Sequence, residues 1–242
     1  MDAIRIEHLT KKYKDVVAVD NLTFSVSQGE LLSLLGVNGA GKTTTIKMLS
    51  CLTQPTDGDA FLLGNSICRE TAAVKTQIAV SPQETAVAPG LSVLENLELI
   101  CGAHGLRKPQ RLAKIDELTS LLGLDQVLSR KAGKLSGGWQ RRLSIAMALV
   151  SDPKILFLDE PTLGLDVLAR SDLWDIIRSL KGKVTIILTT HYMEEAEALS
   201  DRVAIMAKGK LVLCETPEKI KQLAETDNFE QAFIRIVKEA KL

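Results

Sequence analysis

The feature that most constrains the fold is a short apolar segment that runs directly into a glycine-rich loop. Residues 31–35 read LLSLL and residues 36–43 read GVNGAGKT. An almost wholly apolar run of this length is typical of a parallel strand covered on both faces. A glycine-rich turn between such a strand and a helix directs consecutive backbone N–H groups to one point, where a phosphate binds. The segment therefore predicts a parallel sheet with a phosphate-binding loop at its carboxyl edge.

The residue types within this loop predict separate contacts with a nucleotide. Lys42 is expected to reach the β- and γ-phosphates, and the Thr43 hydroxyl is expected to be a direct Mg²⁺ ligand. The alternative is a plain glycine loop, but its position directly after an apolar strand weighs against that interpretation. The candidate nucleotide ligands of the loop are Gly36, Asn38, Gly39, Ala40, Gly41, Lys42, Thr43 and Thr44.

A second apolar run ends in two acidic residues. Residues 155–158 read ILFL and are followed by Asp159 and Glu160. Two carboxylates are thereby placed at the carboxyl end of a buried strand, where sheets of this kind gather their ligands. We expect Asp159 to hold Mg²⁺ through water and Glu160 to polarise the water that attacks the γ-phosphorus. A solvated turn after a core strand is the alternative, which the phosphate loop in the same sheet disfavours.

A third glycine-rich element, Ser-Gly-Gly at residues 136–138, opens a predicted helix. The apolar residues Leu143, Met147 and Val150 recur at three- and four-residue steps, which places residues 140–142 on the polar side of that helix. The glycines expose backbone donors at a helix N-terminus, an arrangement suited to an anion. A glycine N-cap without a ligand is the alternative, and only the order of the elements along the chain argues against it.

The composition limits the classes of partner. The chain has 242 residues, with 30 basic and 30 acidic side chains, so no net field draws it to nucleic acid or anionic lipid. Its four cysteines are widely spaced, without a Cys-x-x-Cys pair, which disfavours a zinc site or a disulfide framework. No apolar run approaches the roughly 18 to 20 residues that cross a bilayer. We therefore expect no nucleic-acid partner and no direct membrane insertion.

The remaining patterns alternate between strands and helices. A capping box of Ser92 and Glu95 begins a helix-rich region that lasts to about residue 149, which predicts a helical lobe inserted into an α/β core. Strands are predicted at residues 4–9, 22–26, 31–35, 155–158, 184–188, 203–206 and 211–213, and helices at 42–52, 169–180 and 193–199, with a helical tail at 217–242.

The order of these motifs resembles that of the ATP-binding cassette family, the ABC ATPases, over about residues 2–220. The resemblance implies an α/β fold: a P-loop NTPase core with a mixed, mainly parallel sheet, an N-terminal antiparallel β subdomain and an inserted α-helical lobe at about 88–150. Residues 1–220 would form one ABC ATPase domain and residues 221–242 a C-terminal helical tail. In this family two cassettes pack head to tail, so each ATP would lie between residues 36–44 of one chain and Ser136, Gly137 and Gly138 of the other.

The resemblance also assigns single residues. Tyr13 matches an aromatic that stacks on adenine, and Gln83 matches a glutamine that touches Mg²⁺ and the attacking water and joins the core to the helical lobe. Asp166 lies in a loop expected to cross the dimer interface, and His191 is expected to contact the γ-phosphate and to position Glu160. Taken singly, Tyr13 could be a strand-edge residue and His191 a structural one. Trp139 stands where the family most often has glutamine, and we expect it to pack at the dimer or lobe interface.

The function implied is that of an ATP-binding and ATP-hydrolysing subunit of an ABC membrane transporter. It would pair with a second ABC ATPase subunit, identical or related, and drive a separate transmembrane permease from the cytoplasmic face of the cell membrane. The sequences HYMEEAE at residues 191–197 and NFEQAF at 228–233 are most similar to the drug, lipid and ion exporter branch. An importer subunit, a soluble ABC ATPase acting on ribosomes or chromosomes, and a non-catalytic ATP-gated scaffold are alternatives. The 94 positions between Lys42 and Ser136 disfavour the long coiled coil of the chromosome type.

Overall fold

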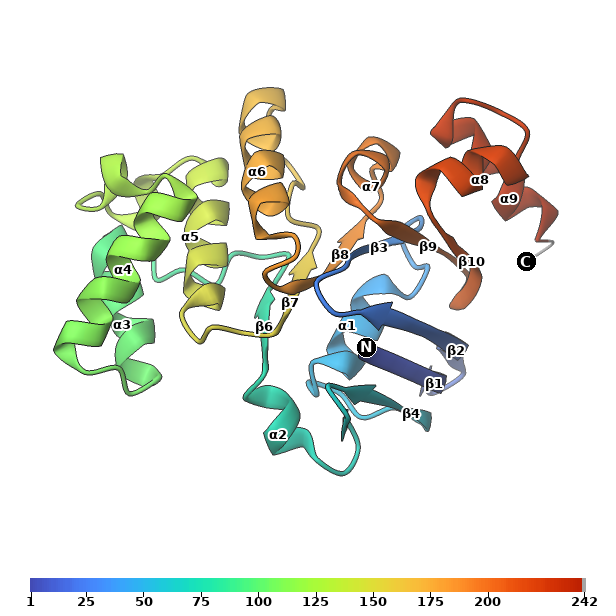
Figure 1. Ribbon diagram of the computed structural model, residues 1–242, viewed down its shortest axis with the longest axis horizontal. Helices are drawn as coiled ribbons and strands as arrows, with labels where there is room; N and C mark the ends of the chain where they lie inside the picture. The colour runs from blue at the N-terminus through green and yellow to red at the C-terminus, as the bar shows by residue number, and fades with distance from the viewer. Residues whose placement is uncertain (241–242) are drawn as a thin grey trace.

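A mainly parallel sheet forms the centre of the molecule. The computed structural model describes residues 1–240, and in this part of the chain six strands form the main sheet, in the order β10-β9-β3-β8-β7-β6 (Figure 1). The strands from β9 to β6 run parallel, and β10 pairs with β9 in the antiparallel sense. The predicted core of mixed, mainly parallel strands is thus confirmed. The strands of this sheet are β3 (Leu31–Leu35), β6 (Ile78–Ser81), β7 (Ile155–Asp159), β8 (Thr185–Thr190), β9 (Arg202–Ala207) and β10 (Lys210–Glu215).

A second, antiparallel sheet has the order β2-β1-β4-β5. Its two long strands extend well beyond the predicted segments, and each contains a residue with a left-handed backbone, His8 and Asn21, with φ of 52° each. The irregular pairing between the strands breaks the alternation of buried side chains that the sequence pattern depends on. The strands are β1 (Asp2–Tyr13), β2 (Val16–Ser27), β4 (Asp57–Leu62) and β5 (Asn65–Ser66).

The two apolar runs are explained by packing on both faces of the main sheet. In β7, Ile155 and Phe157 belong to a hydrophobic cluster shared with the antiparallel sheet and α1 (Lys42–Leu49). Their neighbours Leu156 and Leu158 belong to a different cluster, shared with the helices on the opposite face. Since successive side chains of a strand point to opposite faces, a strand buried on both has no polar positions.

The helical lobe lies at one end of the molecule, drawn in green in Figure 1. Its first helix begins at the predicted capping box: the Ser92 side chain accepts a hydrogen bond from the Glu95 backbone N–H, and the Glu95 carboxylate accepts one from the Ser92 N–H. These two bonds satisfy donors that a helix start would otherwise leave unpaired. The lobe contains α3 (Val93–Ala103), α4 (Lys108–Leu122) and α5 (Gly137–Leu149), with 3₁₀ turns at Asp125–Val127 and Ala132–Lys134.

The C-terminal helices pack on the edge of the main sheet near β9. Phe229, Ala232 and Phe233 are buried in a cluster with Ile220 and Ile205. The predicted domain boundary after residue 220 falls inside α8, and the division into 1–220 and 221–242 stays a prediction; residues 241–242 lie outside the described part. The remaining helices are α2 (Thr71–Lys75), α6 (Val167–Leu180), α7 (Met193–Leu199), α8 (Pro217–Leu223) and α9 (Phe229–Glu239).

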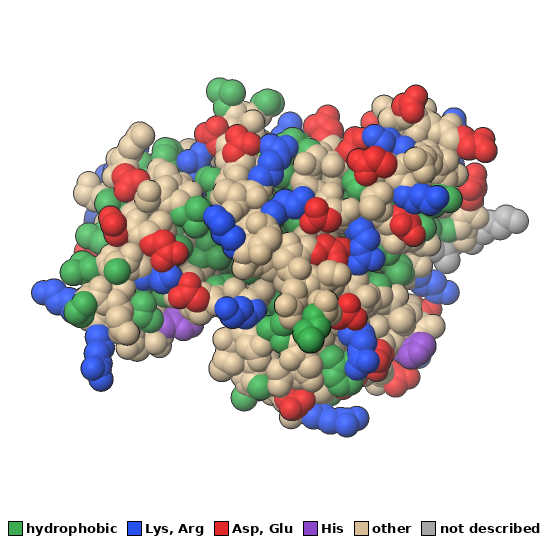
Figure 2. Space-filling view, viewed as in Figure 1, with side chains coloured by type: hydrophobic (Ala, Val, Ile, Leu, Met, Phe, Trp, Pro, Cys, Tyr) green, Lys and Arg blue, Asp and Glu red, His purple; other side chains and the backbone are tan. Residues whose placement is uncertain are grey.

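The surface carries both signs of charge. On the face drawn in Figure 2, Lys and Arg side chains are interspersed with Asp and Glu, and hydrophobic side chains gather at the upper end of α6. Among residues 1–240, no helix combines the length and the apolar character needed to span a membrane.

Candidate functional site

The glycine-rich loop joins β3 to α1 in a path that only glycine can follow at two points. A Cβ on Gly36 would lie 2.4 Å from the Met206 carbonyl oxygen, and one on Gly41 would lie 2.6 Å from that of Ala18. Gly41, the N-cap residue of α1, also has a positive φ of 102° and offers no side-chain hydrogen bond to the helix. The first N–H groups of α1 therefore have no side-chain cap from Gly41, and together with the helix dipole they form a site for an anion.

Lys42 is a buried cation held by the loop itself. Its side chain is 5% exposed, and Nζ donates hydrogen bonds to the carbonyl oxygens of Gly36 (2.7 Å) and Val37 (3.3 Å). Burial lowers the pKa of Lys42, while the nearby carboxylates of Glu160 and Asp159 raise it in part. The ammonium group thus lies at the loop among acceptors that a phosphate oxygen can replace.

Asp159 lies at the end of β7 next to the first turn of α1. Its Oδ1 accepts hydrogen bonds from the hydroxyls of Thr43 (3.2 Å) and Thr189 (2.5 Å). The carboxylate and the Thr43 hydroxyl are therefore adjacent. Hard oxygen atoms of this kind are the ligands that Mg²⁺ prefers.

Glu160 is placed by an unusual backbone turn. Its φ of 47° is left-handed, and its N–H is bonded to both the backbone oxygen (3.1 Å) and the hydroxyl (2.9 Å) of Thr189. The carboxylate lies 3.7 Å from Lys42 Nζ and 3.3 Å from His191 Nδ1. That histidine nitrogen is buried and makes no hydrogen bond of good geometry within the described chain. Strained backbone retained at such a position is typical of functional sites.

Lys42, Glu160 and His191 line one cavity of about 620 Å³ at the carboxyl ends of β3, β7 and β8, and Asp159 lies behind its wall, bonded to the cavity-lining Thr43. Most predicted ligands of the phosphate loop line it, as do Gln83, Glu160 and His191. Tyr13 does not: it is 45% exposed at the end of β1, with Lys11 Nζ 5.0 Å from its ring centre. Its pairing partner Val16 lines the cavity instead. The lining residues are Val16, Val17, Ala18, Asn38, Gly39, Ala40, Gly41, Lys42, Thr43, Thr44, Gln83, Glu160, Leu163 and His191.

The Ser-Gly-Gly element lies apart from this cavity. Ser136 is the N-cap of α5, and a Cβ on Gly138 would lie 3.0 Å from the Cβ of Ala169 in α6. A Cβ on Gly137 would lie 3.5 Å from the Leu165 side chain. Asp166 uses its side chain to cap α6, accepting from the Ala169 N–H at 2.9 Å. One chain therefore brings these residues together with the start of α6, separately from the phosphate loop.

Trp139 packs within the lobe. It contacts the hydrophobic cluster around α3, α5 and α6, and the guanidinium of Arg142 lies 4.8 Å from its ring centre. The next residue, Gln140, donates to the carbonyl oxygens of Ala132 (3.1 Å) and Leu135 (3.3 Å). Trp139 thus packs against the hydrophobic cluster of its own chain, its packing at an interface stays a prediction, and Gln140 stabilises the loop that precedes the helix.

A family model described as "ABC transporter" matches residues 19–163, more than half of the chain. The chain belongs to the ABC transporter family. Its fold and motifs are those of an ATP-binding cassette, the ATPase domain of that family.

Three relatives illustrate the range of this family. The cassette is 42% identical to Nod factor export ATP-binding protein I of Burkholderia pseudomallei, over 86% of this chain and 69% of that protein. It is 38% identical to the probable multidrug ABC transporter ATP-binding protein YbhF of Escherichia coli, over 97% of this chain and 41% of that protein. It is 39% identical to the human phospholipid-transporting ATPase ABCA3, over 90% of this chain and 13% of that protein. The chain therefore spans less than half the length of the last two.

Two solved structures have the same fold. An ATP-binding subunit of an ABC transporter aligns with 97% of the cassette and 99% of its own chain, at a TM-score of 0.85 and 27% identity. A dimeric post-hydrolysis state of the ATP-binding cassette MJ0796, bound to ADP and phosphate, aligns with 88% and 98%, at a TM-score of 0.78 and 25% identity.

Arg141 of the cassette corrects one expectation from the sequence. The helical pattern placed residues 140–142 on the polar side of α5, but Arg141 is only 4% exposed and donates to the carbonyl oxygens of Pro82 (2.6 Å) and Gln83 (2.5 Å). Ile145 lies four residues further along the helix, on the same face as Arg141, and is fully buried. The apolar residue at this position was the feature of the sequence that indicated a buried face.

Glu195 is a second buried ionisable residue that the motifs did not single out. Its side chain has no solvent exposure, and Oε1 accepts a hydrogen bond from the Trp174 indole at 3.2 Å. Burial raises the pKa of Glu195, and this effect exceeds the opposing effects of the neighbouring Thr190, Thr162 and Trp174 side chains and of the charge of Arg170. The folded cassette thus favours the neutral carboxyl.

We expect Glu195→Gln to stabilise the cassette at alkaline pH. Because the folded-state pKa is raised, the stability linked to this carboxyl is fully present below its unfolded pKa and is lost as the pH rises through the folded pKa. Glutamine keeps an acceptor for Trp174 and carries no charge, so the melting temperature of the Glu195→Gln cassette should exceed that of wild type by about 2–4 °C at pH 8. The two melting temperatures should coincide near pH 4.5. Differential scanning calorimetry across this range tests the prediction, and an equal offset at both ends would contradict it.

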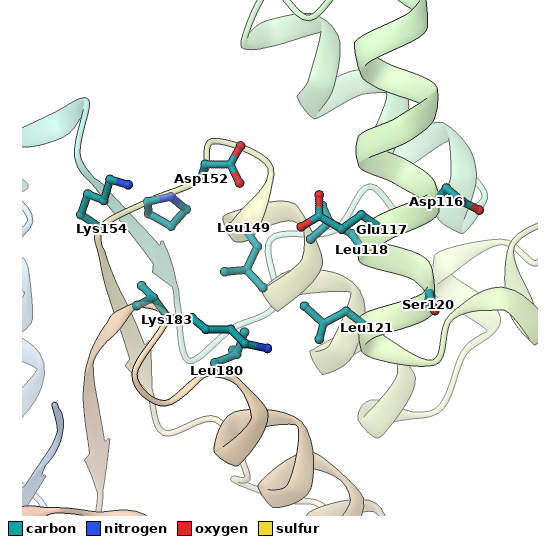
Figure 3. Close-up of a pocket in the computed structure, with 12 residues that line it drawn as sticks. Asp116, Glu117, Leu118, Ser120, Leu121, Leu149, Asp152, Lys154, Leu180 and Lys183 are labelled. Carbon is teal, nitrogen blue, oxygen red and sulfur yellow. The ribbon is translucent and has the colours of Figure 1, made fainter. Parts of the chain in front are cut away.

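A further cavity, of about 650 Å³, lies at the opposite edge of the sheet, where β7 and β8 begin (Figure 3). Leu118, Leu149 and Leu180 form an apolar floor, with Glu117 on one side and Lys183 on the other. It contains none of the predicted nucleotide, metal or catalytic residues. Because ligands of parallel sheets bind at the carboxyl ends of the strands, the phosphate-loop cavity is the candidate site of the cassette.

Proposed function

We propose that this cassette binds MgATP, hydrolyses it as one member of a pair of cassettes, and thereby drives transport by a separate membrane-spanning subunit. The observation that carries the proposal is that Lys42, Glu160 and His191 line one cavity beside the phosphate loop, with Asp159 bonded to the cavity-lining Thr43. These residues lie at the ends of the parallel strands β7 and β8 and at the start of α1, and they provide an anion-binding cation, metal-binding oxygens and a candidate base.

The residues present fit the magnesium salt of ATP. Lys42 is a buried ammonium group whose acceptors are neutral carbonyl oxygens, which a phosphate oxygen can replace with a gain in charge complementarity. Thr43, Asp159 and Gln83 provide a hydroxyl, a carboxylate and an amide oxygen as candidate metal ligands. When bound, Mg²⁺ would neutralise charge that develops on the phosphate oxygens.

The acidic and basic side chains have distinct roles in the proposed reaction. Glu160 would accept a proton from the attacking water, and its left-handed backbone holds the carboxylate toward the cavity. His191 would hold Glu160 through Nδ1 and contact the γ-phosphate. Lys42 would attract the β- and γ-phosphate oxygens, and Tyr13, next to the cavity-lining Val16, would stack on adenine when the nucleotide is bound.

The separation of Ser136, Gly137 and Gly138 from the cavity supports a site shared by two chains. Backbone donors at the start of α5 would meet the γ-phosphate held by the partner. Val167 and Leu168, in the first turn of α6, are 69% and 78% exposed and follow Asp166 directly. Apolar side chains exposed beside that loop are suited to an interface, which supports pairing with an identical or related cassette.

The transport role rests on the names of relatives. Nod factor export protein I and YbhF are named as ATP-binding proteins of exporters or multidrug transporters, so we propose export rather than import. The proposed location is the cytoplasmic face of the cell membrane, through a permease. Co-purification of a polytopic membrane protein with the tagged cassette would support this role, whereas recovery with ribosomes and without membranes would contradict it.

Removal of Mg²⁺ is expected to abolish hydrolysis. Chelation with EDTA should lower phosphate release by about 10²-fold or more, because the metal supplies several kcal/mol of charge stabilisation in phosphoryl transfer. Adding excess Mg²⁺ should restore the rate, which controls for unfolding by the chelator. Phosphate release that persists at full rate in EDTA would reject Thr43 and Asp159 as parts of a metal site.

A further inference from the structure

The two polar links between α5 and the loop after β6 stand out among the buried contacts. Arg141 donates to the backbone oxygens of Pro82 and Gln83, and one turn further along the helix the Ser144 hydroxyl lies 3.0 Å from that of Ser81. All of these groups are buried or partly buried, so the bonds form away from bulk water. The loop that carries Gln83 is therefore attached by its backbone to the helix that begins at Ser136.

The charge of Arg141 makes this link unusual. Its guanidinium pairs with neutral carbonyl oxygens, and the carboxylate of Asp159 acts on it at longer range. Burial lowers the pKa of Arg141, and Asp159 raises it in part. A buried guanidinium that donates to two successive backbone oxygens fixes the direction of that backbone, because its donors have a rigid fork geometry.

The hydrogen bonds of Arg141 connect the Gln83 loop with the helix that begins at Ser136, and these two segments would act on different nucleotides in the proposed pair. Gln83 lines the cavity of its own chain, whereas Ser136 would face the nucleotide held by the partner. Arg141 lies five residues after Ser136, or about 7 Å along the helix axis. A shift of the Ser-Gly-Gly end therefore reaches the Gln83 backbone through less than two helical turns.

We propose that Arg141 is a positioning residue that makes Gln83 respond to the occupancy of the partner's nucleotide at Ser136, so that the two sites of a pair hydrolyse ATP cooperatively. The inference rests on the proposed function and deepens it. In a pair, closure on one nucleotide moves α5, and Arg141 carries that movement to the Gln83 loop of the neighbouring site. Arg141 itself touches neither nucleotide.

The test compares Arg141→Ala and Arg141→Lys with Arg142→Gln as the matched control. Arg142 is the next residue of α5, but its guanidinium pairs with Asp172 and stacks on Trp139. For Arg141→Ala we expect an unchanged dissociation constant for ATP in the single subunit, a kcat lowered about 10-fold, and a Hill coefficient for ATP that falls to 1. Arg141→Lys keeps a donor and should restore part of the kcat and part of the Hill coefficient. The control Arg142→Gln should keep the wild-type Hill coefficient.

Hydrogen exchange of the backbone amides of residues 83–86 gives a second readout. In a Glu160→Gln background, ATP should slow their exchange in the pair, and adding Arg141→Ala should remove that protection while circular dichroism stays unchanged. If Arg141→Ala does not fold, Arg141→Lys serves as the test. Lysine is shorter and has one ammonium group, so it cannot donate to both carbonyl oxygens as arginine does. A wild-type Hill coefficient together with wild-type protection in Arg141→Lys would overturn the proposal. A wild-type protein that neither hydrolyses ATP nor pairs would instead refute the proposed function.

Discussion

Glu160→Gln is expected to lower steady-state ATP hydrolysis by about 10²- to 10⁴-fold, the contribution of a positioned general base. The amide keeps the size of the side chain and an oxygen for His191, but it cannot accept the proton of the attacking water. The ATP dissociation constant should not rise, because the change also removes the only formal negative charge that lies within 4.0 Å of Lys42 in the described chain. Pairs that have bound ATP should therefore persist.

Phosphate release under multiple turnover and size-exclusion chromatography with ATP check these two expectations. Glu194→Gln is the matched control, since Glu194 lies in the first turn of α7 but is 80% exposed, and its one ion pair within residues 1–240 is with Arg170 at 3.9 Å. It should hydrolyse ATP at the wild-type rate. If Glu160→Gln keeps the wild-type rate as well, Glu160 is not the base.

Ser136→Arg is expected to abolish turnover, by about 10²-fold or more, while a single subunit still binds ATP. Ser136 lies at the start of α5 and not in the cavity of its own chain, so the phosphate loop is left intact. The long cationic side chain would occupy the space that the partner's γ-phosphate needs at the helix N-terminus.

A mixing experiment makes this prediction specific to a shared site. Lys42→Ala removes the phosphate-loop cation but leaves α5 intact, so a mixed pair of Ser136→Arg and Lys42→Ala chains contains one complete site. Equal mixing should restore at most about a quarter of the wild-type rate, because half of the pairs are mixed and each has one of two sites. If coupling between the two sites raises kcat about 10-fold, the restored rate should fall to roughly a tenth of that value. Two inactive variants that remain inactive together, although they pair, would show that the site does not combine residues of two chains.

Much of the core and of the site could be predicted because their signals are local. The run at residues 31–35 forms β3 with the predicted bounds, and α7 spans Met193–Leu199 as predicted. A strand covered on both faces has an apolar side chain at nearly every position, and a capping box is complete within four residues. The phosphate loop and the acidic strand end likewise need only neighbouring residues.

The features that could not be predicted depend on contacts between distant residues. Strand β4 pairs with β1 and strand β5 pairs with β4, and their own sequences gave no alternating pattern. The burial of Arg141 depends on two backbone oxygens of the loop after β6, which accept hydrogen bonds from its guanidinium. The sequence of α5 does not predict those acceptors. Tyr13 lies outside the cavity lining, at the end of a strand whose pairing with β2 is irregular.

The position of Lys42 bears on the order of events at the site. Its single ammonium group is shared between two loop carbonyls and the Glu160 carboxylate at 3.7 Å. A phosphate that draws Nζ away from this position removes a cation from the candidate base at the same moment. Binding of ATP would thus separate the Glu160 carboxylate from the Lys42 ammonium group. In a cassette without nucleotide, Lys42 would keep the charge of the candidate base Glu160 neutralised.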